Sequence, residues 1–172
     1  MNLRTFSTVV SLTVVSACGC PHEPGPLVSY DGWTVVDASD DPFTDRLENV
    51  DCPPRTGYGA EFLGGEAVFS VDTQNCNYLT AVQPSALDVC PGEELLLRLW
   101  HFALNGSGES HVAIAVGGST IWEERIPIPA EAQAFTPRVP APEISVGTPV
   151  HIHVHNHGSN SYSFIEVSVV ED

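Results

Sequence analysis

Short apolar runs separated by glycine and proline are the feature of this sequence that most restricts its fold. The 172-residue chain contains 14 glycines and 14 prolines, and both residue types interrupt helices and strands. No segment repeats its apolar residues at the 3.6-residue spacing of an amphipathic helix. The apolar runs have the length of strands and are bounded by turn residues. The sequence therefore predicts an all-β fold, a two-sheet antiparallel sandwich of jelly-roll type.

Eight segments have the composition of strands. They are 33–36, 66–71, 78–83, 94–104, 111–116, 119–126, 149–156 and 161–170. A turn at 106–107 is expected to join the fourth and fifth as a hairpin, and Gly117-Gly118 to join the fifth and sixth. The segment 127–142 holds five prolines, so we expect it to cross between the sheets without pairing in either.

The first 17 residues have the pattern of an export signal. Arg4 precedes an apolar run over 6–15 that is too short for a membrane span, which needs about 20 apolar residues. The segment 15–18, Val-Ser-Ala-Cys, resembles the lipobox of bacterial lipoproteins. That resemblance implies that residues 1–17 are removed and that Cys18 is acylated. Residues 18–29 would then form a lipidated tether, and 30–172 a single β-sandwich domain.

The same resemblance implies where the protein is located, and it implies that the membrane is a partner through the lipid anchor. The protein would be held in the bacterial cell envelope, at the outer membrane, because Gly19 is not an inner-membrane retention signal in that family. Two or more acyl chains make such an anchor durable. The net charge of −16, with only six basic residues, excludes a generic nucleic-acid binder, since neutralising phosphates requires a basic surface.

The cysteines favour disulfides. The chain has five, and lipidation of Cys18 would leave an even number in an exported protein. Three pairings are possible, of which we prefer Cys52 with Cys76, around the strand 66–71, and Cys20 with Cys90. A zinc site of thiolates is the alternative, but the chain has no Cys-x-x-Cys spacing to support it.

A histidine-rich strand is the strongest local pattern. Residues 150–157 read Val-His-Ile-His-Val-His-Asn-His, and strand alternation places His151, His153 and His155 on one face. Neighbouring imidazoles on that face are close enough to share a metal ion, with His111 and Glu124, expected opposite each other, as further ligands. Zinc, copper and nickel suit imidazole ligands, and zinc or copper is the expected cofactor. The alternative is a polar face of neutral histidines.

Two known metal motifs offer a comparison. The His-x-His pattern resembles the metal motif of cupins and is similar to one in copper-zinc superoxide dismutases. The further ligands that each family needs do not follow in this sequence, so the resemblance implies neither chemistry. Separately, the segment 37–51 contains six acidic residues. Its aspartates could hold calcium, although the EF-hand spacing is absent.

Two tryptophans form the second candidate site. The expected hairpins place Trp122 opposite Ala113 and Trp100 on the other side of that small residue, with the rings about 10 Å apart. Such a pair could stack sugar rings while Arg98 binds their hydroxyls, in a manner similar to β-sandwich carbohydrate-binding modules. The alternative is that both rings belong to the core.

Motifs of catalysis are missing from the sequence. There is no Gly-x-Ser-x-Gly, His-Glu-x-x-His or phosphate loop. The sequence therefore predicts a lipid-anchored binding protein without catalytic activity. A metal ion is the first expected ligand and a glycan the second, and a surface protein-interaction or structural lipoprotein is the third interpretation. The oligomeric state is left open.

Overall fold

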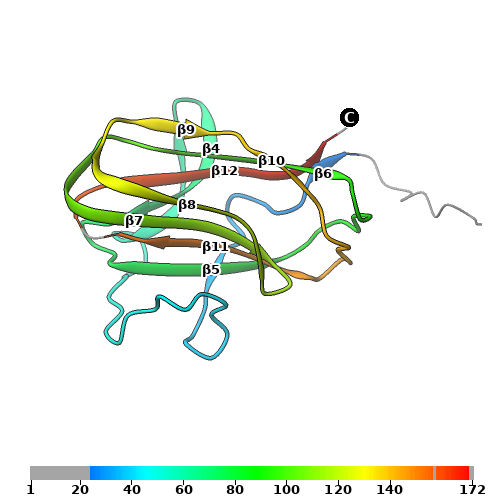
Figure 1. Ribbon diagram of the computed structural model, residues 1–172, viewed down its shortest axis with the longest axis horizontal. Coiled ribbons are helices and arrows are strands. Elements are labelled where there is room, and N and C mark those ends of the chain that lie inside the picture. Colours follow the sequence, from blue (N-terminus) through cyan, green and yellow to red (C-terminus); the bar gives the residue numbers. More distant parts are fainter. Residues whose placement is uncertain (1–23, 157, 171–172) are drawn as a thin grey trace, which may run out of the picture.

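The computed structural model describes residues 24–156 and 158–170 as two antiparallel sheets packed face to face (Figure 1). Over these ranges the chain forms no helix, and hence none that could cross a membrane. This confirms the predicted two-sheet sandwich, and each of the eight predicted segments contains a strand. The predicted signal peptide, Cys18 and Cys20 lie outside the described residues.

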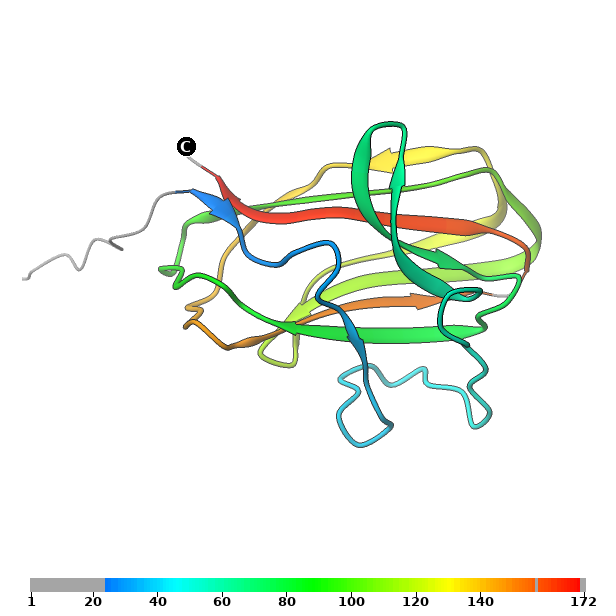
Figure 2. The same cartoon turned by 180° about the vertical axis from the view of Figure 1, so that it is seen from behind.

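The larger sheet has seven strands and the smaller has five. The larger sheet runs in the order β10 (Arg138–Pro140), β6 (Glu94–His101), β12 (Ser161–Val170), β4 (Glu66–Asp72) and β3 (Tyr58–Leu63), with β1 (Gly25–Pro26) beside β12 and β9 (Gln133–Phe135) beside β6. Figure 2 shows the β3–β4 hairpin in teal and β12 in red.

The smaller sheet has the histidine-rich strand at its centre. Its order is β2 (Thr34–Val35), β5 (Tyr78–Pro84), β11 (Pro149–His155), β7 (Leu104–Val116) and β8 (Ser119–Ala130). The loop 36–57, which joins β2 to β3, lies below β5 in Figure 1 and covers part of the outer face of this sheet.

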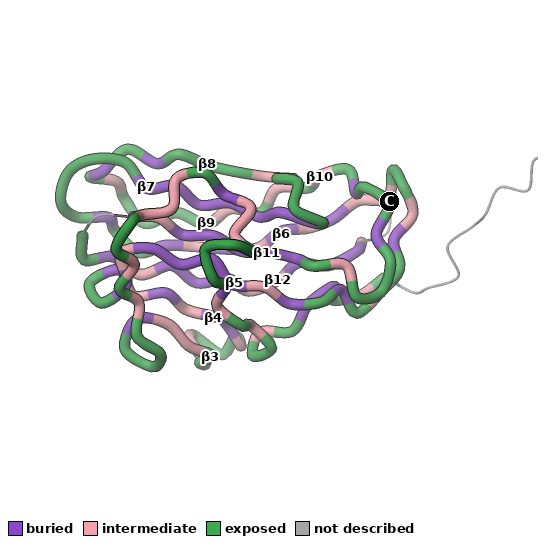
Figure 3. The backbone as a smooth tube through the Cα atoms, turned by 90° about the horizontal axis from the view of Figure 1, so that it is seen from below, coloured by how far each residue is buried: buried purple, intermediate pink, exposed green. Residues whose placement is uncertain are grey.

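The core lies between the two sheets. Alternate residues of β6 point inward, so that Leu95, Leu97 and Leu99 are at most 1% exposed. Ile152 of β11, in the facing sheet, is completely buried. Figure 3 shows that buried segments lie along the strands and exposed segments at the turns. Each such side chain contributes about 1.5 to 3 kcal/mol through burial.

The predicted hairpin between 94–104 and 111–116 is wrong. β6 pairs with β12 in the larger sheet, and β7 pairs with β11 and β8 in the smaller. Residues 104–110 extend β7 instead of turning. The prediction failed because the apolar residues of β6 and β7 meet across the sandwich, face to face, and an alternation pattern does not distinguish this from pairing within one sheet.

The turn at Gly117-Gly118 is confirmed, since Val116 pairs with Ser119. An irregularity between Ile114 and Ala115 then shifts the register by one residue. Trp122 therefore lies opposite Ile114, and not opposite Ala113 as expected.

The proline-rich segment crosses between the sheets as predicted, but the expectation that it would not pair is wrong. β8 reaches Ala130 in the smaller sheet, and β9 and β10 then pair with β6 in the larger. Its prolines are tolerated because β8 and β10 are edge strands, where one side of the strand needs no donor.

A disulfide joins Cys52 to Cys76, as predicted. It links the end of the loop 36–57 to the residues before β5. Cys90 is also disulfide-bonded, while Cys20, the partner predicted for it, is not among the described residues.

A tyrosine that connects the two sheets makes stability sensitive to alkaline pH. The side chain of Tyr162 is fully buried, and its hydroxyl donates to Ser110 Oγ at 2.7 Å. Burial raises the pKa of Tyr162 to about 12, although the Ser110 contact opposes the shift. The unfolded chain ionises near pH 10, so this contribution to stability should be fully present below pH 10. It should fall by about 1.4 kcal/mol per pH unit up to the folded-state pKa.

Urea unfolding of the wild type and of Tyr162→Phe between pH 9 and 12 measures this effect. The variant cannot ionise at this position, so its free energy of unfolding should fall less steeply above pH 10. Equal slopes for the two proteins would contradict the shift.

Candidate functional site

The outer face of the smaller sheet carries the histidines. Val150, Ile152 and Val154 lie in the core, so the intervening residues of β11 point to the other side. His153 lies between Thr80 of β5 and Ala113 of β7. The sequence therefore predicted which face of β11 carries the imidazoles.

The loop 36–57 covers these histidines. Phe43 stacks on the ring of His153, with 4.4 Å between ring centroids and 22° between the planes. Phe43 also forms a small buried cluster with Ala113 and Ala115. Because these alanines are small, the loop can approach the sheet closely, and His153 is completely buried as a result.

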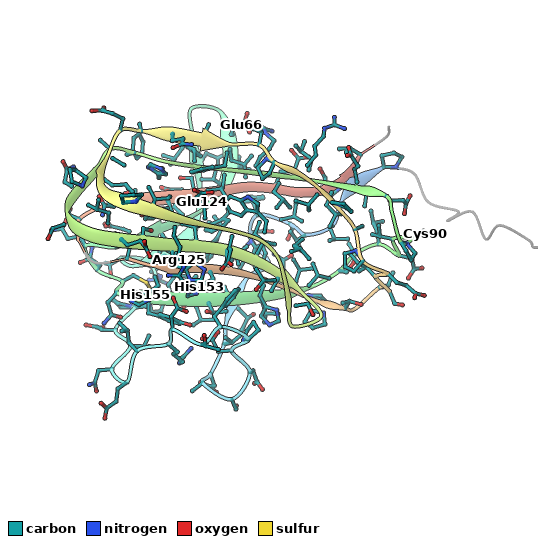
Figure 4. All side chains as sticks on the ribbon, in the orientation of Figure 1. Glu66, Cys90, Glu124, Arg125, His153 and His155 are labelled. Atoms are coloured by element: carbon teal, nitrogen blue, oxygen red, sulfur yellow. A yellow bond between two sulfur atoms is a disulfide. The ribbon has the colours of Figure 1, made fainter. Side chains whose placement is uncertain are left out.

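Asp45 of this loop is the centre of the cluster. Its Oδ2 lies 2.8 Å from His111 Nδ1 and 3.0 Å from His155 Nδ1. Its Oδ1 lies 3.4 Å from His153 Nε2. We call Asp45, His111, His153 and His155 the Asp45 cluster; Figure 4 labels its two β11 members.

A second carboxylate holds the loop in place. Asp41 Oδ2 accepts hydrogen bonds from Tyr78 at 2.8 Å and from Arg46 at 2.7 Å. Asp41 Oδ1 accepts one from the Thr80 hydroxyl at 3.1 Å. The Asp41 side chain is 1% exposed, so these bonds replace the water that the carboxylate loses.

Burial and charge act in opposite directions on the Asp45 cluster. Burial would raise the pKa of Asp45, but the contacts with His153, His111 and His155 outweigh it and hold that pKa well below its usual range. Burial lowers the pKa of His153, against the opposing effect of Asp45.

Two of the predicted ligands lie elsewhere. His151 is on the same face of β11 and is buried, but its Nδ1 has no hydrogen-bond partner among the described residues. Glu124 is exposed and lies opposite Val112, so the expected pairing with His111 is wrong. The register shift in β8 brings Glu123 to His111 instead, with Oε2 at 3.0 Å from Nε2. Figure 4 shows Glu124 apart from His153 and His155.

Asp45 is the residue that sequence reasoning did not place. In the sequence it is one of six acidic residues in 37–51, and it is 66 positions from His111. The predicted disulfide was a usable signal, because joining Cys52 to Cys76 brings the end of this loop to the start of β5, beside the histidine-rich strand.

The predicted tryptophan pair is not formed. Trp100 lies on β6 in the larger sheet and Trp122 on β8 in the smaller. Trp122 packs against the core, with its ring 5.7 Å from that of Phe135. The rings cannot form the expected platform, because the hairpin that would have brought them together does not exist.

Trp100 instead borders a row of small residues on the outer face of the larger sheet. Adjacent strands pair Trp100 with Ser163, Ser163 with Ser70, and Ser70 with Gly59. The two serine hydroxyls are 3.3 Å apart. A side chain at Gly59 would meet no atom within 4 Å, so this end of the row is open.

Two hollows adjoin this row. One, of about 640 Å³, lies over β3 and β4 and includes Ser70 and Phe102 in its lining. The other, of about 320 Å³, is lined by Trp100 and Arg98 among others, and Leu63 borders both. We call the two hollows and the row between them the Trp100 groove. Figure 2 shows the strands that carry it.

Charged and aromatic groups border the groove. Arg98 donates to Glu66 at 3.1 Å and to Glu166 at 3.3 Å, and these contacts raise its pKa. Phe102 lies against Trp100, with the ring centroids 4.8 Å apart, and is 47% exposed. Aromatic faces and fixed hydrogen-bonding groups are therefore both available to a ligand.

Comparisons with known proteins address the fold only. No protein-family model and no curated protein matches the sequence. A cleaved adhesin domain of Lys-gingipain from Porphyromonas gingivalis is 13% identical with a TM-score of 0.51, over 86% of this chain and 98% of that one. This similarity is to another domain of the same general fold.

Two carbohydrate-binding modules are also structurally similar. TmCBM61, in complex with β-1,4-galactotriose, is 8% identical with a TM-score of 0.45, over 83% of this chain and 90% of that one. A family 22 module of Clostridium thermocellum is 12% identical with a TM-score of 0.44, over 90% of this chain and 96% of that one. These scores carry no argument about a ligand.

Proposed function

We propose that the protein is a lipid-anchored, non-catalytic β-sandwich of the cell envelope that binds a neutral glycan in the Trp100 groove. One observation carries this proposal: the paired rings of Trp100 and Phe102 border two adjoining hollows on the outer face of the larger sheet, Phe102 one of them and Trp100 the other.

The groove offers a complementary group for each of the two kinds of surface on a sugar ring. A sugar ring has an apolar face that stacks on aromatic side chains and a rim of hydroxyls that needs donors and acceptors. Trp100 and Phe102 supply the first. Arg98 with Glu66, and the hydroxyl of Ser70 in the larger hollow, supply the second.

The charge of the chain narrows the class of glycan. With a net charge of −16, the field of the protein repels acidic polymers. Two arginines line the groove: Arg98 is already paired with two glutamates, and Arg55 shares the larger hollow with the acidic residues Glu61 and Asp72. The glycan that fits is therefore neutral.

The position of β1 agrees with binding away from the membrane. Gly25 and Pro26 pair with Val169 and Ser168 near the end of β12, whereas the Trp100 groove crosses β12 at Ser163. Five residues of extended strand span about 17 Å. If a lipidated tether precedes β1, the membrane lies near the end of β12 that pairs with β1, and the groove lies toward the other end of β12, away from the membrane.

Truncating Trp100 tests the proposal. Tag-free protein is screened against soluble neutral polysaccharides by affinity electrophoresis, and the best ligand is then titrated by calorimetry. Trp100→Ala should weaken binding about tenfold or more, because lost stacking of about 1.4 kcal/mol corresponds to tenfold in affinity. Trp122→Ala, on the other sheet, should bind as the wild type does.

Thermal melting of both variants distinguishes lost contacts from lost folding. A folded Trp100→Ala variant with wild-type affinity would refute the groove. So would a screen in which the wild type binds no neutral polysaccharide at millimolar concentration.

The anchor has its own test. Cys18→Ser should abolish incorporation of labelled palmitate and move the protein from the membrane fraction to the soluble fraction, since acylation at this cysteine is the proposed means of attachment. The wild-type protein, expressed at the same level, is the control. Palmitate incorporated by the variant would contradict the lipobox interpretation.

A further inference from the structure

A buried polar cluster that glycan binding does not use lies on the opposite sheet. In the Asp45 cluster, ring nitrogens of three histidines face one carboxylate at 2.8 to 3.4 Å. The protonation of each ring decides whether these are hydrogen bonds or opposed lone pairs, and the groups on the far side of each ring fix that protonation.

The neighbours of His153 place its hydrogen on Nδ1. This atom lies 3.1 Å from the carbonyl oxygen of Leu79 and 3.0 Å from Thr80 Oγ1. The Thr80 hydroxyl donates its hydrogen to Asp41, so both neighbours of Nδ1 accept. In the neutral ring, Nε2 then carries a lone pair.

That lone pair faces another acceptor. His153 Nε2 and Asp45 Oδ1 are both buried, neither has a hydrogen-bond partner among the described residues, and they are 3.4 Å apart. Burying an unsatisfied polar group is unfavourable, and two facing acceptors also repel each other. A cation between them would turn both atoms into ligands.

His111 is arranged in the same way. Its Nε2 lies 3.0 Å from the Glu123 carboxylate and its Nδ1 lies 2.8 Å from Asp45 Oδ2, so a hydrogen donated to Glu123 would leave the Nδ1 lone pair for a metal ion. Metal-binding histidines almost always donate their outer N–H to a carboxylate or a carbonyl group. Glu123 serves His111 in this role, as Leu79 serves His153.

We propose that the Asp45 cluster binds one transition-metal ion of the Zn(II) class, which joins the loop 36–57 to β7 and β11. The ligand atoms of Asp45, His111 and His153 lie within 4.8 Å of one another, and His155 Nδ1, 3.0 Å from Asp45 Oδ2, would supply the fourth ligand. Three imidazoles and one carboxylate are a donor set that tetrahedral zinc accepts. Two ligand atoms about 2.05 Å from a tetrahedral ion are roughly 3.3 Å apart, close to the 3.4 Å between His153 and Asp45. The ion would replace the opposed lone pairs with bonds.

The same strand supplies a matched control. His151 lies two residues from His153, on the same face of β11, and is also buried. Among the described residues, Asp45 contacts His111, His155 and His153 but not His151. Loss of an imidazole at position 151 therefore tests burial without removing a ligand.

Metal binding is measured on tag-free, chelator-treated protein with its disulfides intact. Zinc is titrated in competition with a chromophoric chelator, and bound metal is counted by mass spectrometry. The wild type should bind one equivalent. Asp45→Asn and His153→Ala should each weaken zinc binding by about 100-fold or more, because the loss of an outer-shell partner alone costs about 10- to 100-fold, whereas His151→Ala should keep the wild-type affinity. Zinc should also slow proteolysis within 36–57 in the wild type but not in Asp45→Asn.

Two outcomes would overturn the proposal. One is a wild type that binds no zinc, copper or nickel at micromolar concentration and whose loop is equally protected with and without metal; protonated histidines would then hold Asp45. The other is equal zinc affinity in the wild type, Asp45→Asn and His153→Ala. Trp100→Ala should bind zinc normally, so this test is independent of the glycan proposal.

Discussion

Replacing Ile152 with alanine should lower the free energy of unfolding by about 2 to 5 kcal/mol. Ile152 is completely buried at the middle of β11, paired with Ala81 on one side and Ile114 on the other. Since β11 is hydrogen-bonded on both edges, its backbone cannot move inward to fill the space that the lost atoms leave. The cost of the cavity therefore adds to the lost burial.

Urea unfolding at neutral pH measures this effect. Val146→Ala is the control, because Val146 is 61% exposed and its truncation should change stability by less than about 0.5 kcal/mol. A loss below about 1 kcal/mol for Ile152→Ala would contradict the assignment of this face of β11 to the core.

Removing the disulfide should cost about 3 kcal/mol. Cys52 and Cys76 are separated by 24 residues, and a crosslink of this span stabilises mainly by restricting the unfolded chain. In the folded state, Asn77 holds the same end of the loop through Asp51 N at 2.9 Å and the carbonyl oxygen of Asn49 at 3.0 Å. The fold should therefore survive the loss.

The double variant Cys52→Ala/Cys76→Ala is compared with the wild type by urea unfolding, with circular dichroism to confirm the β-sheet content. The expected result is a lower midpoint with an unchanged folded spectrum. Equal stability would show that the bond does not restrict the unfolded chain, and a variant without folded structure would show that the Asn77 contacts cannot hold the loop.

The sequence correctly predicted two local features of the fold: the buried face of β11 and the turn at Gly117-Gly118. The pattern of β11 separated Ile152 from His153 correctly, because strand geometry alone sets which side chains point inward. Gly117-Gly118 located a turn for the same local reason: both residues have positive φ, 57° and 81°, which glycine adopts without strain. Local rules were sufficient in both cases.

The pairing of β6 and β7 and the register of β8 were not predictable in this way. Inward-pointing residues such as Leu97 and Ile114 have the same pattern whether they meet within a sheet or across the sandwich. One extra residue in β8, Ile121 between Thr120 and Trp122, moved Glu123, not Glu124, to His111, and a bulge leaves little trace in an apolar pattern.

Neither proposed site could be assembled from sequence alone, since each joins distant segments. Asp45 is 110 positions from His155. The Trp100 groove takes Gly59, Ser70, Trp100 and Ser163 from four strands. Residues of these types are common on surfaces, and only the strand order places them in one row.

The location of the bound glycan tests the central claim most directly. The chain has three tryptophans, so ¹⁵N-labelled protein gives three indole N–H signals that single substitutions assign. On titration with the polysaccharide selected by the screen, the Trp100 signal should move with the binding isotherm while the Trp122 signal stays in place. A shift confined to Trp122 or Trp33, with Trp100 unmoved at saturation, would contradict binding in the Trp100 groove.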